Sequence, residues 1–113
     1  MSTVHDEALR QLDIVRRDFE ARLDDMIGEI TGAWEAARST SDPAKLTALV
    51  QLVHRLAGNA GFFGLHGVSQ SASALEQALD RWTDRGSPRE SDFAELIPLI
   101  QGLRESANSI EVE

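Results

Sequence analysis

Apolar side chains recur every three or four residues through nearly the whole chain, and no segment alternates apolar and polar residues with a period of two. Spacings of three and four place apolar side chains on one face of an α-helix, whereas a half-buried strand needs the missing alternation. Four such segments, at residues 3–38, 43–63, 66–84 and 91–109, are joined by short polar stretches. The sequence therefore predicts an all-α chain that folds as an antiparallel up-down four-helix bundle.

The joints between these segments carry residues that begin and end helices. Asp42 and Pro43 suit the N-cap and the first helical position. Gly64 suits the position just after a helix C-terminus, and Ser91 suits an N-cap of the last helix. Pro98 lies inside that last segment, where the missing N–H predicts a kink or a break.

The size and charge of the chain narrow its class of partner. A length of 113 residues predicts one domain over residues 1–113. The formal net charge is −8 and no basic run is present, which argues against nucleic acid and against an anionic membrane surface. The chain has no cysteine, no apolar stretch long enough to span a membrane and no signal-peptide pattern, so we expect a cytoplasmic location and a protein partner.

His54 occupies an unusual position in the second predicted helix. At about 100° per residue it falls roughly 110° from the centre of the apolar stripe, so its ring reaches solvent at the edge of the buried face. Gly58 and Gly61 follow on the same side. Glycine inside a helix costs about 1 kcal/mol relative to alanine, which indicates either a large group approaching the imidazole or close packing of a neighbouring backbone. An ordinary surface histidine remains the alternative on periodicity alone.

The segment from His54 to Gly64, HRLAGNAGFFG, resembles the signature of histidine phosphotransfer (HPt) domains, and Leu75-Glu76 falls where that family tends to carry a Leu-Glu pair. The resemblance implies that His54 accepts a phosphoryl group from the aspartyl phosphate of one receiver domain and passes it to another. It implies response-regulator receiver domains and a hybrid sensor kinase as partners. An HPt-like adaptor that binds without transfer is the alternative, and a plain helical interaction bundle is a third.

HPt domains carry no ATP site, and the glycine spacing at positions 58, 61 and 64 matches neither nucleotide-binding fingerprint. We therefore expect a phosphocarrier with no cofactor of its own, whose classification as an enzyme stays open. The Mg²⁺ that drives transfer is expected on the partner receiver domain.

Glu76 is the candidate for orienting the imidazole, because a carboxylate that accepts a hydrogen bond from the Nδ1–H group keeps the proton on Nδ1 and leaves Nε2 free to attack. A solvated acid, or an ion pair with Arg55 or Arg81, is the alternative. Many HPt domains carry a lysine three residues after the histidine, where this chain has Ala57, which the apolar stripe places in the core. Arg55 is the nearest cation and the candidate counter-charge for the phosphoryl group; otherwise it is an ordinary surface arginine.

Gly58, Gly61 and Phe62 are the candidate docking residues. Phe62 falls on the outward face, where it either contributes to an apolar patch for the receiver or packs against the third helix. His5 and His66 lack the spacing of a metal site, so no metal is expected. We expect a monomer, and the starting methionine favours a free-standing protein; the sequence does not name the kinase or the regulator.

Overall fold

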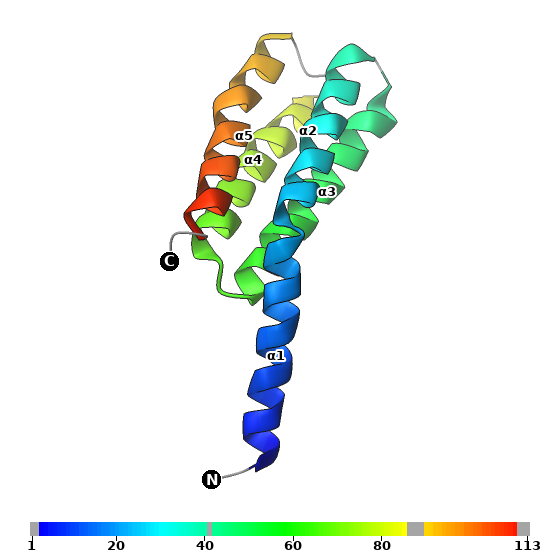
Figure 1. Cartoon of the computed structure of the whole chain (residues 1–113). Helices are drawn as coiled ribbons and strands as arrows, with labels where there is room; N and C mark the ends of the chain where they lie inside the picture. Colours follow the sequence, from blue (N-terminus) through cyan, green and yellow to red (C-terminus); the bar gives the residue numbers. More distant parts are fainter. Residues whose placement is uncertain (1–2, 41, 86–89, 111–113) are drawn as a thin grey trace.

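A computed structural model describes residues 3–40, 42–85 and 90–110 (Figure 1). All five elements in these residues are helices: α1 (Thr3–Ala21), α2 (Leu23–Ser39), α3 (Pro43–Phe62), α4 (His66–Arg85) and α5 (Glu90–Ile110). The predicted all-α class is confirmed for this part of the chain, but the number of helices differs, because the first predicted helix is two.

The break between α1 and α2 is a single residue, Arg22, with φ −96° and ψ 0°. Its N–H donates to the carbonyl of Phe19 at 3.1 Å, which tightens the turn, and its carbonyl accepts from Met26 at 3.0 Å. Neither glycine nor proline marks this position. The prediction of one helix over residues 3–38 was therefore wrong at a point where the sequence carries no breaking residue.

The core lies among α2, α3, α4 and α5. Helix α2 contacts α3 and α5, and α4 contacts the same two helices from the opposite side. Helices next to one another in the chain run in opposite directions from α2 onward (Figure 1). The largest fully buried side chains come from all four: Ile27, Ile30, Leu49, Val53, Val68, Leu75, Leu79, Trp82, Leu96 and Leu103.

Helix α1 projects from one end of this core (Figure 1). Within the described residues, α2 is the only helix whose backbone lies close to α1, and Phe19, near the C-terminal end of α1, is the only large apolar residue of this helix that is buried. Leu9, Leu12 and Val15, which belong to the predicted apolar stripe, remain 53%, 47% and 50% exposed. The N-terminal part of the predicted apolar stripe therefore lies outside the core formed by α2 to α5.

Gly64 lies just after the end of α3, in the link to α4, as its position predicts. Its φ of +76° is a left-handed conformation that glycine adopts without a Cβ clash. The Gly64 N–H donates to the Gly61 carbonyl at 3.1 Å, and the Leu65 N–H donates to the Ala60 carbonyl at 2.8 Å. These two bonds form a Schellman motif, which satisfies the last carbonyls of α3 and turns the chain directly into α4.

The other predicted helix signals have mixed outcomes. The Ala44 N–H donates to Asp42 Oδ1 at 3.0 Å, with Pro43 at the first helical position, so this N-cap is confirmed. Helix α5 begins at Glu90, one residue before the predicted cap at Ser91, and it continues through Pro98. Of the two outcomes predicted at Pro98, a kink or a break, the break does not occur. Residues 86–89 of the predicted loop lie outside the described residues.

Candidate functional site

His54 lies on α3 at the border between the buried face and solvent. Val53, its neighbour in the chain, is fully buried, whereas the side chain of His54 is 76% exposed. One residue advances the helix by about 100°, so a single position separates a core side chain from one at the edge. The regular helix, held by the packing of Val53 and Leu56, fixes the backbone from which the imidazole projects.

The imidazole contacts a carboxylate on the next helix. Glu76 follows the fully buried Leu75 on α4, and its side chain is 22% exposed. His54 Nδ1 and Glu76 Oε2 form a hydrogen bond. Because an ionised carboxylate only accepts, Nδ1 carries the proton in this pairing. Among the described residues Glu76 forms no ion pair with Arg55 or Arg81, so the sequence alternative of such a pair is not observed.

The two glycines after His54 have different surroundings. A Cβ at Gly61 would lie 3.2 Å from Ser69 Oγ on α4, so this glycine permits close packing of the two helices. Ser69 Oγ itself donates to the backbone carbonyl of Ala57 at 3.0 Å. A Cβ at Gly58 would meet nothing within 4 Å, and Gly58 is exposed one turn from His54. Close packing of a neighbouring helix therefore explains the glycine at position 61. Space for a large group that approaches the imidazole explains the glycine at position 58.

The position that holds a lysine in many HPt domains is closed to solvent here. Ala57 is buried, as the apolar stripe predicts. Arg55 is exposed beside His54 on α3 and forms no ion pair within the described part of the chain. It is the cation adjacent to His54 in sequence.

Phe62 lies near the end of α3 with 74% of its surface exposed. Its ring meets Phe63 edge-on, with centroids 5.0 Å apart, and Phe63 packs in turn against Phe19 at 5.1 Å. Packing of Phe62 against α4 is not observed. Phe62 and Phe63 line a groove of about 210 Å³ together with Leu9 and Leu12 of α1. The sequence reasoning missed this groove, although the apolar stripe of residues 3–38 contained half of it.

The other two histidines stand apart from this site. His5 is exposed on α1, and His66 is exposed at the first position of α4. In residues 3–40, 42–85 and 90–110 no three His, Asp or Glu side chains are grouped to hold a metal ion. No described helix combines the length and hydropathy needed to cross a membrane.

Comparison with known proteins gives one match. A family model described as the Hpt domain matches residues 12–109, from the middle of α1 almost to the end of α5, and the match includes both His54 and Glu76. No curated protein and no solved structure matches the chain.

Proposed function

The chain belongs to the Hpt domain family of two-component phosphorelays, and we propose on this premise that His54 is its phosphoryl-accepting residue. Hpt domains interact with receiver domains in phosphorelays. The proposed function is to accept a phosphoryl group from the aspartyl phosphate of one receiver domain and to pass it to another. A hybrid sensor kinase is the proposed source and a response regulator the proposed destination, and the chain itself is proposed to be cytoplasmic.

One observation carries this proposal: the hydrogen bond between His54 and Glu76 engages Nδ1 while most of the imidazole stays exposed. With the proton held on Nδ1, the lone pair of Nε2 is available as a nucleophile. A buried histidine could not meet a partner's aspartyl phosphate, and an unpartnered one would sample both tautomers.

The transfer step balances without a further reactant. Nε2 attacks the phosphorus of the receiver's aspartyl phosphate, a P–N bond forms, and the bond from phosphorus to the aspartate oxygen breaks. The freed carboxylate stays on the receiver, and the imidazole ring gains a positive charge that Glu76 stabilises. In the return step a carboxylate oxygen of the second receiver attacks phosphorus and the P–N bond breaks. Mg²⁺ held by the receiver would neutralise charge on the transferring group.

In the proposed function, the helices of the fold position the residues of the transfer site. Helices α2 to α5 would act as an up-down four-helix bundle, with His54 on the second of the four and Glu76 on the third. Gly58 would leave room for the receiver beside the imidazole, and Phe62 would add an apolar contact two turns further along α3. Arg55 would supply positive charge near the bound phosphoryl group.

The test is phosphoryl transfer from a phosphorylated receiver domain to the purified chain. We expect an acid-labile, base-stable phosphate on the wild type and none on His54→Gln. The matched control is His66→Gln, which removes another exposed histidine at the start of α4 and should accept phosphate normally.

Failure of transfer from any cognate receiver to the wild type would overturn the proposal. If receiver binding persisted without transfer, the adaptor function would take its place. Phosphate that survives His54→Gln would show that another residue is the acceptor.

A further inference from the structure

Helix α1 carries an apolar row that the described part of the chain covers only at Phe19 and, in part, at Leu9 and Leu12. At about 100° per residue, Val4, Leu12 and Val15 share one face with the buried Phe19, and Leu9 borders it. Val4 is 80% exposed, and the other exposed members of the row are about half exposed. Residues 3–11 also precede the stretch matched to the Hpt family, so the proposed transfer function does not account for them.

The chain exposes more surface than a compact protein of its mass. Its accessible area is 7305 Å² for 12.4 kDa, whereas a typical folded monomer of that mass exposes about 6,100 Å². The radius of gyration is 16.2 Å, compared with about 13 Å for a compact domain of roughly 100 residues. The excess surface, about 1,200 Å², agrees with the projection of α1 in Figure 1.

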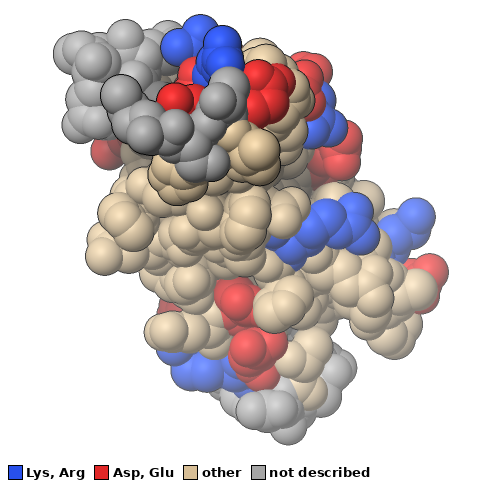
Figure 2. Space-filling view, turned by 90° about the horizontal axis from the view of Figure 1, so that it is seen from below, with Lys and Arg blue, Asp and Glu red and all other residues tan. Residues whose placement is uncertain are grey.

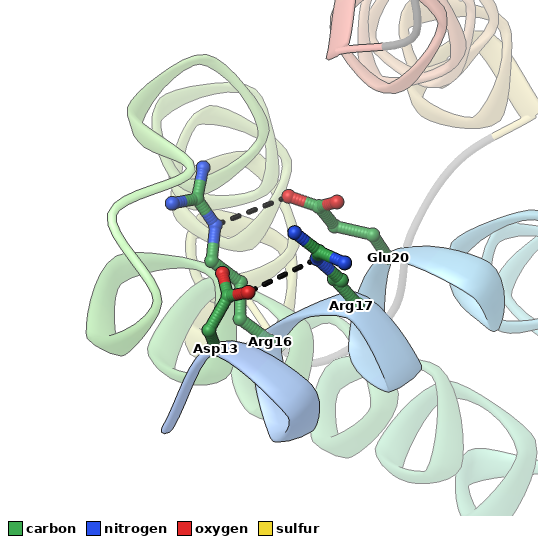
Figure 3. Close-up of polar contacts among 4 residues, drawn as sticks. All are labelled: Asp13, Arg16, Arg17 and Glu20. Atoms are coloured by element: carbon green, nitrogen blue, oxygen red, sulfur yellow. Dashed lines mark hydrogen bonds and ion pairs between the residues drawn. The ribbon is translucent and has the colours of Figure 1, made fainter. Parts of the chain in front are cut away.

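The charged groups of α1 and of Arg22 are largely paired within the same segment. All four arginines form ion pairs three or four residues away: Arg10 with Glu7, Arg16 with Glu20, Arg17 with Asp13, and Arg22 with Asp18. Figure 3 shows two of these pairs, Arg16–Glu20 and Arg17–Asp13. In the view of Figure 2 the basic groups lie next to acidic ones. This surface therefore offers no block of positive charge for an anionic membrane or a nucleic acid.

We propose that the apolar row of α1 pairs with the same row of α1 in a second copy of the chain, as an antiparallel two-fold dimer. The apolar row, flanked by charged groups that are already paired, is complementary to another apolar row of the same kind. A two-fold dimer uses the same surface on both chains, so this row is sufficient to form it. Specific interfaces bury about 1,200–2,000 Å² in total. If each chain buried half of its excess surface in the dimer, the total buried area would reach the lower end of that range.

The direction of pairing follows from where the bundle lies. Leu9 and Leu12 share a groove with Phe62 and Phe63, so the end of α3 lies beside the middle of the apolar row. In a parallel pair the two bundles would lie at the same end of the paired helices and would face each other. Antiparallel pairing places the bundles at opposite ends of the paired helices.

The dimer leaves His54 away from the interface, although the sequence alone favoured a monomer. His54 precedes Phe62 by eight residues on α3, a rise of about 12 Å. A two-fold pair through α1 would therefore present two copies of His54, each on its own bundle.

Sedimentation velocity of the full chain over a range of concentrations tests the association. We expect a reversible monomer–dimer equilibrium for the wild type, and monomer alone for the double variant Val4→Glu/Val15→Glu. The matched control is Ile14→Glu, which adds charge at another exposed apolar residue on the opposite side of α1 and should dimerise as the wild type does. Circular dichroism should show equal helix content in all three, because the substituted side chains lie outside the core.

A wild type that stays monomeric at its highest soluble concentration would overturn the proposal, as would equal loss of dimer in Ile14→Glu. Phosphoryl transfer to the Val4→Glu/Val15→Glu variant should remain at the wild-type level, because neither residue lines the groove that contains Phe62. Transfer and association are thus measured separately, and the failure of one does not decide the other.

The absence of cysteine from the sequence allows the orientation to be tested with introduced thiols. Antiparallel pairing predicts a disulfide between a chain with Val4→Cys and a chain with Arg22→Cys, and little self-crosslinking of Val4→Cys. Parallel pairing predicts the reverse, so predominant self-crosslinking of Val4→Cys would overturn the antiparallel arrangement.

Discussion

Ser69 on α4 donates a hydrogen bond from Oγ to the backbone carbonyl of Ala57 on α3, three residues after His54. The same hydroxyl lies against Gly61, where a Cβ would approach it to 3.2 Å. Helices α3 and α4 are thus joined by a polar contact close to the pair formed by His54 and Glu76. Their separation at the site is fixed by specific atoms as well as by apolar packing.

Ser69→Ala should lower the free energy of unfolding by about 1 kcal/mol, because it removes this part-buried hydrogen bond. Urea denaturation followed by circular dichroism measures the change. Gln70→Ala, at the exposed neighbouring position, is the control and should shift stability by less than about 0.5 kcal/mol. Equal stability of Ser69→Ala and wild type would show that the hydrogen bond contributes nothing net.

Glu76→Ala should slow phosphoryl transfer to His54 by about 10–100-fold, the typical loss when the carboxylate that fixes a histidine's orientation is removed. Rapid-quench kinetics with a phosphorylated receiver measures the rate, and receiver affinity should stay unchanged. Asp80→Ala removes an exposed carboxylate one turn along α4 and should transfer normally. An unchanged rate in Glu76→Ala would remove Glu76 from the proposed site.

Gly58→Ala should raise the free energy of unfolding by about 1 kcal/mol, because the added methyl group meets nothing within 4 Å and alanine favours the helix. If Gly58 gives the receiver access to His54, the same variant should transfer more slowly. Gly28→Ala, in equally open space on α2, should gain similar stability without changing transfer. A Gly58→Ala protein that transfers at the wild-type rate would contradict the docking role.

Phe62→Ala should weaken receiver binding about tenfold if the exposed ring is a central docking contact. Isothermal titration with the receiver measures the affinity. Ile97→Ala, an exposed apolar residue on α5, should bind as the wild type does. Equal affinities of the two variants would indicate that Phe62 lies outside the receiver interface.

Arg55→Gln should shift the phosphoryl equilibrium toward the receiver by no more than about fivefold, since an exposed ion pair contributes about 0.2–1 kcal/mol. The ratio of phosphorylated chain to phosphorylated receiver at equilibrium measures the shift. A change far larger than fivefold would mean that the phosphoryl group is held in a desolvated site.

Helical periodicity predicted α3, α4 and α5 to within one residue at each end, because caps and glycines mark those ends. The same helical arithmetic placed His54 at the edge of the buried face, and the resemblance to HPt domains indicated Glu76; the structure brings the two side chains into contact. The helix bounds and the edge position of His54 were predictable because one repeated spacing and a few terminal residues decide the local geometry.

Other features of the fold and the site depend on tertiary contacts, which the spacing of apolar residues in the sequence does not reveal. Periodicity shows which face of α1 is apolar, but whether another helix covers that face depends on how far the bundle extends. Arg22 breaks the helix without a glycine or proline to mark it. Gly58 and Gly61 look alike in the sequence, and only the position of Ser69 on α4 separates their surroundings.

The link of three residues, Phe63 to Leu65, confines the candidate site to one helical hairpin. His54 and Glu76 are only 22 positions apart, so the loop that must close to bring them together is short. Local contacts of this kind form quickly during folding, and we expect the pair to assemble with the hairpin itself. Substitutions that preserve the packing surfaces of α2 and α5 can then accumulate without moving the two reactive side chains.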